Sequence, residues 1–324
     1  MIRTDYQYKS TNFKTSLMNA SGPCCTTFEE LSGIGKSDAA GAIVIKSATI
    51  EPREGNIKPR YFENNHLSIN SMGLPNPGYK KLANLIPKLK EFNKPIIASI
   101  SGFSKSDYLE MIKEFDSKGA DILELNLSCP NIIGKPQAGY NFEYSREVLE
   151  AARDLTNKPI AVKLPPYLDL VHQKQIAEIL IDTKVDFAVL INSPGNCLVI
   201  NPEKEEAVIK PKKGLGGIGG DIIKPIALGN VFSFYQLLNN KVKIIGCGGI
   251  NTGTDVFEFI LAGADMVQIA TTYAKEGPNA FNRISRELKE LMQKKGYKSL
   301  EDFRGKLKEK SNDENEEEYD FNVK

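Results

Sequence analysis

Short runs of apolar and β-branched residues recur along the chain and alternate with longer stretches of mixed polarity. Near-continuous apolar runs are typical of parallel β-strands that are covered on both faces. We therefore expect eight buried strands, at residues 15–20, 42–47, 95–101, 120–127, 159–164, 187–192, 242–246 and 265–270.

The stretches between these runs have the apolar spacing of helices. From Tyr108 to Phe115 the apolar residues follow the i, i+3, i+4, i+7 pattern of one helix face. Ser104 precedes this stripe as a candidate cap, and Gly119 follows it as a candidate stop. Similar stripes occupy residues 82–92 and 281–291.

Eight strand–helix units in one unbroken series predict an α/β fold, a (β/α)8 TIM barrel. We expect an N-terminal hairpin, and long loops over the C-terminal face at 48–77, 131–143 and 194–221. A doubly wound sheet is the alternative, which the single series disfavours. The barrel would be one catalytic domain, residues 1–307. Residues 308–324 form an acidic tail whose composition predicts disorder.

Charge and hydropathy exclude several classes of partner. Lys plus Arg number 42 and Asp plus Glu 41, so no net field favours nucleic acid or anionic lipid. No apolar run approaches the roughly 18 residues that span a membrane. The first residues lack the apolar core of a signal peptide, so we expect a cytoplasmic protein.

The cysteines and histidines narrow the candidate chemistry. The five cysteines contain no C-x-x-C spacing, so neither a disulfide framework nor a zinc site is indicated. The two histidines, His66 and His172, stand far apart, which disfavours a metal site or a histidine-based triad. We therefore expect no metal. A general base must be a cysteine, a carboxylate, a lysine or an activated serine.

Polar residues gather where the predicted strands end. In a barrel these ends meet at one mouth, where sites are built. A lysine in an apolar strand is costly without an anionic partner, so Lys46 and Lys163 at matching ends indicate a shared anionic ligand. Structural ion pairs are the alternative for each. The full set is Asn19, Ser21, Lys46, Ser47, Ser101, Asn126, Ser128, Cys129, Lys163, Asn192, Ser193, Gln268 and Thr271.

The segment Asn126–Asn131, Asn-Leu-Ser-Cys-Pro-Asn, places a thiol, a hydroxyl and two carboxamides at the mouth of one strand. A cysteine there can also be a small packed hydrophobe. The polar residues at the other strand ends favour a chemical role for Cys129.

Two glycine-rich segments suggest different roles. Gly248 and Gly249 follow the seventh strand, and Thr271 follows the eighth, where barrels commonly bind phosphate through backbone N–H groups. An ordinary glycine turn is the alternative. Gly214–Gly219 satisfies G-x-G-x-x-G, but no buried strand precedes it and no acid follows at the right distance. We expect a flexible glycine loop near the mouth.

The loop Asn70–Gly78 is rich in turn residues, which is the simplest reading of it. It can also fold over the mouth and offer the Asn70 amide and the N–H groups around Gly73. Together with Asn126, Asn131 and Asn192, this would place four carboxamides around one pocket. Carboxamides both donate and accept hydrogen bonds, which suits a planar heterocycle with imide edges.

These residues resemble the dihydroorotate dehydrogenase family, specifically its soluble, fumarate-type class 1A, over about residues 1–307. The markers are Asn19–Gly22, Lys46–Ser47, Asn70–Asn76, Asn126–Asn131, Lys163, Asn192–Ser193, Gly214–Gly220 and Gly246–Gly249.

The resemblance implies oxidation of (S)-dihydroorotate to orotate in de novo pyrimidine biosynthesis, with Cys129 as the base and residues 131–143 as a lid. It implies FMN, held by Ala20, Ser21, Lys46, Ser47, Asn126, Lys163, Ile191, Gly220, Gly248, Gly249, Ala270 and Thr271. It implies that substrate is held by Lys46, Asn70, Met72, Gly73, Leu74, Asn126, Asn131, Asn192 and Ser193.

The resemblance also separates the classes. The membrane-linked class has a serine base and a quinone-binding extension, and class 1B works with an iron–sulfur/FAD subunit. Cys129 and the loop Ser71–Asn76 match class 1A, which implies a homodimer and fumarate as acceptor. Ala270 departs from the glycine that the family often has there, and the acidic tail extends past the family's usual end.

The chemistry fits this resemblance. Dihydroorotate loses a proton from C5 and a hydride from C6, which passes to flavin N5, and Lys163 would stabilise the charge left near N1. A thiolate near lysines suits the role of base. Two other functions remain open: another FMN barrel oxidoreductase acting on pyrimidines in nucleosides or RNA, and a flavin- or orotate-binding protein without catalysis.

Overall fold

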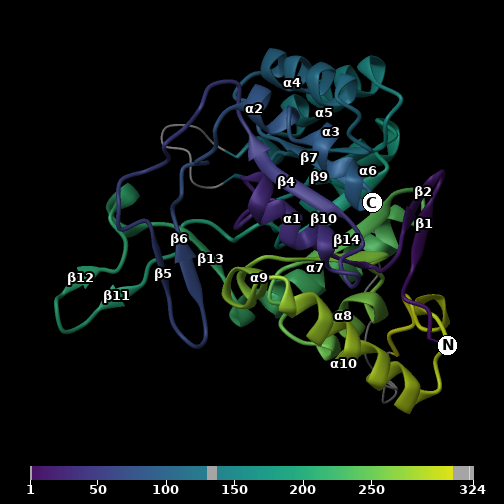
Figure 1. The fold of residues 1–324 in the computed structure, drawn as a ribbon. Coiled ribbons are helices and arrows are strands. Elements are labelled where there is room, and N and C mark those ends of the chain that lie inside the picture. The colour runs from purple at the N-terminus through teal and green to yellow at the C-terminus, as the bar shows by residue number, and fades with distance from the viewer. Residues whose placement is uncertain (1, 130–136, 309–320, 322–324) are drawn as a thin grey trace.

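The centre of the molecule is a sheet of eight parallel strands (Figure 1). It is seen in a computed structural model that describes residues 2–129, 137–308 and 321. Each strand lies within or overlaps one predicted run, which confirms all eight strands and the (β/α)8 barrel. They are β3 (Leu17–Asn19), β4 (Ile43–Ala48), β7 (Ile96–Ile100), β8 (Ile122–Asn126), β9 (Ile160–Lys163), β10 (Phe187–Leu190), β14 (Lys243–Cys247) and β15 (Met266–Ile269).

The strands run in the order β3-β15-β14-β10-β9-β8-β7-β4, and the two end strands meet through a side chain. Among the described residues no β-ladder joins β3 to β4. Instead the Asn19 carboxamide donates to Val44 O at 2.7 Å and accepts from Val44 N–H at 3.0 Å. Gly41 N–H also donates to Leu17 O at 2.7 Å. These three bonds close the barrel at its seam.

Helices surround the barrel and alternate with its strands (Figure 1). The predicted helix with Ser104 as its cap is confirmed as α4, since the Ser104 hydroxyl accepts from Asp107 N–H and Gly119 follows with φ 88°. The helices are α1 (Phe28–Lys36), α2 (Tyr79–Ala83), α3 (Ile86–Leu89), α4 (Lys105–Ser117), α5 (Phe142–Leu155), α6 (Leu170–Asp182), α7 (Lys224–Leu238), α8 (Gly253–Leu261), α9 (Thr271–Glu276) and α10 (Asn279–Lys295).

The apolar stripe over 82–92 is not one helix. It is divided into the end of α2, the short α3 and a 3-10 turn at Lys90–Phe92. Pro87 lies in the first turn of α3, where its missing N–H costs nothing, whereas it would break a helix that continued through it. The stripe over 281–291 is confirmed as the buried face of α10.

Three small antiparallel sheets decorate the barrel. The predicted N-terminal hairpin is β1 (Tyr6–Tyr8) with β2 (Thr11–Phe13), and the Tyr8 hydroxyl donates to Asp186 at 2.7 Å, just before β10. A second sheet joins β5 (Tyr61–Glu63), β6 (Ser68–Asn70) and β13 (Gly217–Gly219). A third pairs β11 (Ile200–Asn201) with β12 (Glu206–Ala207). Figure 1 shows the hairpin and the other two sheets on opposite sides of the barrel.

The second half of the G-x-G-x-x-G segment is a strand. Residues 217–219 form β13 and pair with β6 through their backbones, so the prediction of a flexible loop is wrong for these three residues. Since glycine has no Cβ, a neighbouring backbone can pass close to it: a Cβ on Gly216 would lie 2.5 Å from Asn70 O. The segment's location beside the barrel mouth agrees with the prediction.

Strand alternation divides the core into two layers. Residues such as Ile43 and Ile45 pack outward against the helices, while Val44 and Ala161 belong to a smaller cluster inside the barrel. Because side chains of a strand alternate between faces, the residues two positions after Val44 and Ala161 also point inward. These residues are Lys46 and Lys163.

No helix within the described part of the chain has the length and apolar character needed to cross a membrane.

Candidate active site

A cavity of about 470 Å³ opens at the carboxyl ends of the barrel strands. This volume lies within the range of small-molecule and cofactor sites. All but one of the residues that the resemblance assigns to cofactor, substrate or catalysis line it, whereas Asn19, Ser101 and Ser128 of the predicted mouth do not. The assigned residues that line it are Ala20, Ser21, Lys46, Ser47, Asn70, Met72, Gly73, Leu74, Asn126, Cys129, Lys163, Ile191, Asn192, Ser193, Gly220, Gly248, Gly249, Ala270 and Thr271. The exception, Asn131, lies outside the described residues.

Two buried ammonium groups face this cavity. Lys46 is 8% exposed and its Nζ donates to Gly22 O at 2.7 Å. Lys163 is 4% exposed and its Nζ donates to Gln268 Oε1 at 3.0 Å. Within the described part of the chain, neither ammonium has a carboxylate oxygen within 4.0 Å. The structural ion pairs considered as an alternative are therefore not formed among these residues.

A buried carboxylate lies beneath the cavity floor, and sequence reasoning missed it. Glu124 of β8 is fully buried and points into the barrel, two residues after the inward-facing Ile122. It accepts hydrogen bonds from Ser21 and Ser99 at 3.0 and 3.1 Å, and from Gln268 at 2.7 Å. The signal was present in the sequence, because an acid within an apolar strand is rarely buried unless it has partners.

The described carboxamides at the mouth are held by the protein itself. Asn126 Nδ2 donates to Ser47 Oγ at 3.2 Å, and its Oδ1 accepts from Ser128 N–H at 3.2 Å. Asn192 Nδ2 donates to Ser128 O at 3.1 Å. Asn70 Nδ2 donates to Gly217 O at 3.2 Å, across the β6–β13 wall. Three of the four predicted carboxamides thus line one cavity from different elements.

The glycine segment after β14 forms one end of the cavity. Gly248 and Gly249 have φ of 128° and 72°, a region that favours glycine. A Cβ on Gly249 would also lie 2.8 Å from Lys224 N, so no larger residue fits. Thr271, the first residue of α9, lines the same cavity. Backbone N–H groups beside glycines and helix starts are suited to bind phosphate.

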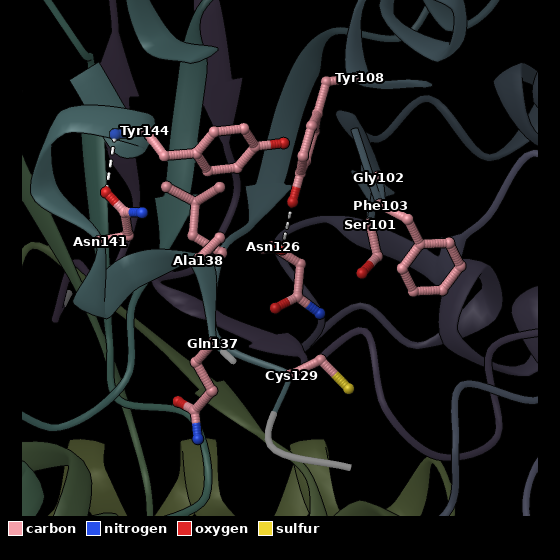
Figure 2. Close-up of a pocket in the computed structure, with 11 residues that line it drawn as sticks. Ser101, Gly102, Phe103, Tyr108, Asn126, Cys129, Gln137, Ala138, Asn141 and Tyr144 are labelled. Carbon is pink, nitrogen blue, oxygen red and sulfur yellow. Dashed lines mark hydrogen bonds between the residues drawn. The ribbon is translucent and has the colours of Figure 1, made fainter. Parts of the chain in front are cut away.

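Cys129 lines two cavities, and Figure 2 shows it among the residues that line the smaller one. A second cavity of about 230 Å³ shares Asn126 and Cys129 with the main one. Its other walls come from the loop Ser101–Phe103, from Tyr108 of α4 and from the chain leading into α5. Figure 2 shows Tyr108 pointing toward Asn126, whose backbone oxygen accepts from the Tyr108 hydroxyl at 3.0 Å. Burial raises the pKa of Tyr108, so this hydroxyl keeps its proton as a donor.

The other cysteines are placed differently. Cys25 is fully buried, and desolvation raises the pKa of its thiol to about 12 despite the nearby Lys46. Partial burial also raises the pKa of Cys24 and of Cys197, neither of which lines the cavity. Cys247 lines the cavity but is 6% exposed. Cys129 is the half-buried thiol that reaches both cavities.

The family follows from comparison with known proteins. A family model described as dihydroorotate dehydrogenase matches residues 4–292. The chain belongs to the dihydroorotate dehydrogenase family.

Curated relatives confirm the predicted class 1A group. Dihydroorotate dehydrogenase A (fumarate) of Lactococcus lactis subsp. cremoris is 48% identical over 305 residues, which cover 93% of this chain and 98% of the relative. Dihydroorotate dehydrogenase (fumarate) of Lachancea kluyveri is 49% identical over 299 residues, covering 91% and 95%. A ligand-free DHODH structure from Eimeria tenella has a TM-score of 0.80 at 23% identity, covering 94% of this chain and 91% of that one, and confirms the fold.

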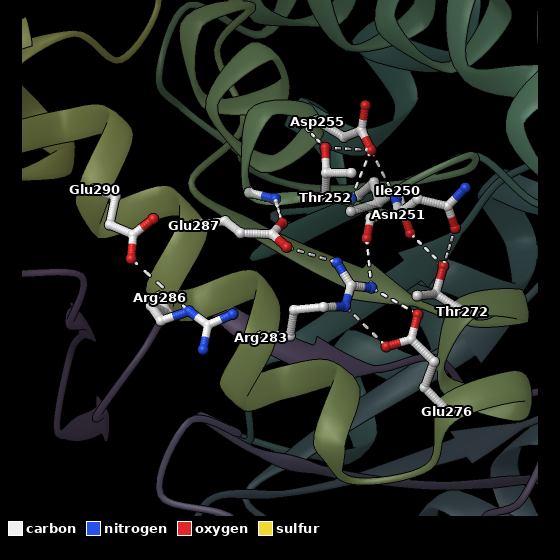
Figure 3. Close-up of polar contacts among 11 residues, drawn as sticks. Ile250, Asn251, Thr252, Asp255, Thr272, Glu276, Arg283, Arg286, Glu287 and Glu290 are labelled. Atoms are coloured by element: carbon white, nitrogen blue, oxygen red, sulfur yellow. Dashed lines mark hydrogen bonds and ion pairs between the residues drawn. The ribbon is translucent and has the colours of Figure 1, made fainter. Parts of the chain in front are cut away.

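The loop after β14, which follows Gly248 and Gly249, is braced by α10 (Figure 3). Arg283 donates to Asn251 O at 2.9 Å, and it pairs with Glu276 at 2.6 Å and Glu287 at 3.0 Å. Glu287 in turn accepts from Gly253 N–H at 2.8 Å. Arg283 therefore ties the loop after β14 to the end of α9. Sequence reasoning missed this residue.

A second link joins the same two segments. The Thr272 hydroxyl donates to Ile250 O at 2.7 Å and also contacts the Asn251 side chain (Figure 3). Ala270, which departs from the family's frequent glycine, has φ −119°. That is an ordinary value for an alanine, so this backbone does not require glycine.

The sheet β5-β6-β13 adds cavity residues that were not predicted. Tyr61, Glu63 and Ser68 line the cavity from β5 and β6, and Lys275 of α9 lies 3.8 Å from the Glu63 carboxylate. The predicted long loop over the C-terminal face at 48–77 pointed to this region without naming these residues. The predicted lid, 131–143, is outside the described residues up to 136, and its described part holds a 3-10 turn, Ala138–Tyr140.

Proposed function

We propose that this chain oxidises (S)-dihydroorotate to orotate in de novo pyrimidine biosynthesis, with FMN as cofactor and fumarate as acceptor. The family and the fumarate-type names of the relatives support the reaction and the acceptor. The observation that carries the proposal is the pair of buried lysines, Lys46 and Lys163, which face one cavity without a carboxylate partner among the described residues. Such charges fit an anionic cofactor and an anionic substrate.

The residues present fit FMN. Its phosphate would lie on the backbone of Gly248, Gly249, Ala270 and Thr271, where a Cβ on either glycine would approach α7 and the turn before it. FMN would supply the acceptor for the hydride. Lys163 would hold positive charge beside the ring system, where it stabilises the reduced form. The rest of the cofactor would be lined by Ala20, Ser21, Lys46, Ser47, Asn126, Lys163, Ile191 and Gly220.

The substrate would be held by charge and by carboxamides. Lys46 would pair with the substrate carboxylate, and Asn70, Asn126 and Asn192 would bind the imide edges of the ring. Met72, Gly73, Leu74 and Ser193 would complete the pocket. We assign Asn131 to the same role from the resemblance alone.

Cys129 would act as the base. Its thiolate takes the proton from C5, hydride leaves C6, and the C5–C6 double bond of orotate forms. Cys129 is half-buried and lines the same cavity as Lys46 and Lys163, and the thiolate is the form of cysteine that takes up a proton. The two cavities that meet at Cys129 leave it reachable from more than one side.

We also propose a cytoplasmic homodimer that binds no nucleic acid and no metal. The resemblance to class 1A suggests the homodimer, and the balanced charge of the chain argues against a nucleic-acid partner. Light scattering coupled to gel filtration measures the mass in solution directly, and a monomeric mass would contradict the homodimer.

The reaction is tested by reducing the purified protein without oxygen. We expect a yellow protein that bleaches with dihydroorotate and regains its colour with fumarate. Stopped-flow mixing of the reduced protein with fumarate, NAD or a quinone then ranks the three oxidants. Failure to bleach would contradict the proposed reaction, whereas fast reoxidation by NAD or quinone and not by fumarate would contradict only the acceptor.

A further inference from the structure

Glu124 occupies a position that the proposed reaction leaves unexplained. It is fully buried, it does not line the cavity, and it lies directly beneath residues that do. All three of its hydrogen bonds are donated to it, by Ser21, Ser99 and Gln268. This is the bonding pattern of an ionised carboxylate, which only accepts. The cavity floor therefore rests on a fixed negative charge.

Gln268 connects this carboxylate to Lys163. Gln268 Nε2 donates to Glu124 Oε2 at 2.7 Å, and Gln268 Oε1 accepts from Lys163 Nζ at 3.0 Å. An amide has a donor end and an acceptor end, so the two charges together fix which way the amide points. The Lys163 ammonium is thereby held by an oxygen instead of forming a direct ion pair with the carboxylate.

The other oxygen of Glu124 leads toward Asn126. Glu124 Oε1 accepts from Ser99, and the Ser99 and Ser47 hydroxyls are 2.8 Å apart. Ser47 Oγ then accepts from Asn126 Nδ2 at 3.2 Å. A chain of hydrogen bonds thus links the Glu124 carboxylate to Lys163 on one side of the cavity floor and to Asn126 on the other. Buried polar networks of this kind hold side chains in single orientations when every member is satisfied.

The charge balance of the floor gives Glu124 a second effect. Lys46, Lys163 and Glu124 are all buried inside the barrel. Two positive charges alone would strongly favour a reduced, anionic flavin, and a nearby negative charge opposes this. Because Gln268 lies between Glu124 and Lys163, Glu124 can offset the positive charge of the lysines without pairing directly with Lys163.

We propose that Glu124 is a positioning residue that orients Lys163 through Gln268 and lowers the reduction potential of the bound flavin. This inference rests on the proposed function, because it requires FMN above the floor.

The midpoint potential of the bound FMN, measured by spectroelectrochemical titration, tests the proposal. Glu124→Gln keeps the size and an accepting oxygen but removes the charge, so we expect a shift to more positive potential. Asp265→Asn is the matched control, because Asp265 is also a buried acid but lies at the opposite ends of the strands, where it accepts from Ile244 N–H at 2.8 Å. We expect no shift in this control. A potential equal to wild type in Glu124→Gln, or an equal shift in both variants, would overturn the proposal.

A second variant covers the case in which Glu124→Gln does not fold or loses FMN. Gln268→Met keeps the length but removes the amide, so the Lys163 ammonium is drawn toward Glu124 and away from the flavin. We expect a shift to more negative potential, opposite to that of Glu124→Gln. An unchanged or more positive potential would overturn the role of Gln268 as a bridge. Wild-type protein that binds no FMN would instead contradict the proposed function itself.

Discussion

The side chain of Asn19 and the backbone of Val44 exchange two hydrogen bonds, at 2.7 and 3.0 Å, across the seam between β3 and β4. A side chain therefore replaces the backbone ladder at the place where the barrel closes. Both groups of Val44 are buried, so without Asn19 they would be left without these partners.

Replacing Asn19 tests the seam. We expect Asn19→Leu to lower the free energy of unfolding by roughly 2–5 kcal/mol, because a buried donor and a buried acceptor each lose a partner. Urea unfolding followed by circular dichroism measures the change. Asn12→Leu, at an exposed position of β2, is the control and should stay within about 0.5 kcal/mol of wild type. Equal stability of the two variants would show that Asn19 does not hold the seam.

Removing the thiol at the junction of the two cavities tests the base. We expect Cys129→Ala to slow flavin reduction by dihydroorotate by a factor of about 10² or more, because the C5 proton loses its acceptor. Orotate should still bind, as seen by its perturbation of the flavin spectrum. Cys197→Ala, which removes a thiol that does not line the cavity, should reduce flavin at the wild-type rate. Near-normal reduction in Cys129→Ala would remove this residue from its role.

Replacing the buried Lys163 should affect the stability of the cofactor-free protein and the binding of FMN in different directions. Lys163→Met should leave the cofactor-free protein as stable as wild type or more so, because a costly buried charge is removed. It should weaken FMN binding by about 10- to 100-fold, the loss of one charge-assisted contact. Thermal unfolding and flavin fluorescence titration measure the two effects.

Lys94→Met is the matched control for the lysine variant. Lys94 is also buried, and burial lowers the pKa of its amine, but it donates to Ser37 O and Ala40 O, away from the cavity. Its replacement should leave FMN affinity unchanged. Equal losses of FMN affinity in Lys163→Met and Lys94→Met would contradict a specific role for Lys163.

Arg283 offers a test of the brace behind the loop after β14. Arg283→Ala should cost roughly 1–3 kcal/mol of stability and weaken FMN binding, because the loop after β14 loses one of its two links to α9. Arg286→Ala, three residues along the same helix, removes an exposed pair with Glu290 at 3.8 Å and should change neither. Isothermal titration with FMN separates the two variants. Unchanged affinity in Arg283→Ala would mean that the loop keeps its position without Arg283.

Asp255 predicts how the same region responds to acid. Burial raises the pKa of this carboxyl, but bonds from Lys224 and from the N–H groups of Asn251 and Thr252 outweigh it, so its pKa is lowered. A carboxyl with a lowered folded pKa stabilises above its unfolded value, about 3.9, and the stabilisation is lost as pH falls through the folded pKa. We expect Asp255→Asn to be less stable near neutral pH and to depend less on pH below about 4. Melting temperatures across this range measure it, and parallel curves for the two proteins would contradict the prediction.

The sequence predicted best those features that are recorded by a local pattern within a single strand. The run at 159–164 predicted β9, and the inward position of Lys163 follows from alternation with Ala161. Glu124 was missed because a single acid does not disturb an apolar run, and its three partners lie on other strands. Arg283 was missed because its bond to Asn251 spans 32 positions, which no local pattern records.

The wall of the cavity was the hardest part to predict. β13 consists of Gly217, Ile218 and Gly219, and glycine is depleted in strands. Its pairing with β6 depends on the barrel bringing two distant connections together. Asn19 was equally hard to interpret, since a carboxamide at the end of a strand can either contact a ligand or join two strands where a barrel closes.

The pairing of β6 with β13 also determines at what stage of synthesis the cavity can form. Asn70 and Gly217 are bonded although they stand 147 positions apart, and β15 pairs with β3 at the other end of the sequence. A ribosome that has made only the first two hundred residues carries β6 paired with β5 but without β13, and it has made neither the glycine segment after β14 nor β15. Binding of the proposed FMN would therefore follow nearly complete synthesis, and until then the emerging chain exposes one edge of β6 to chaperones and to other chains.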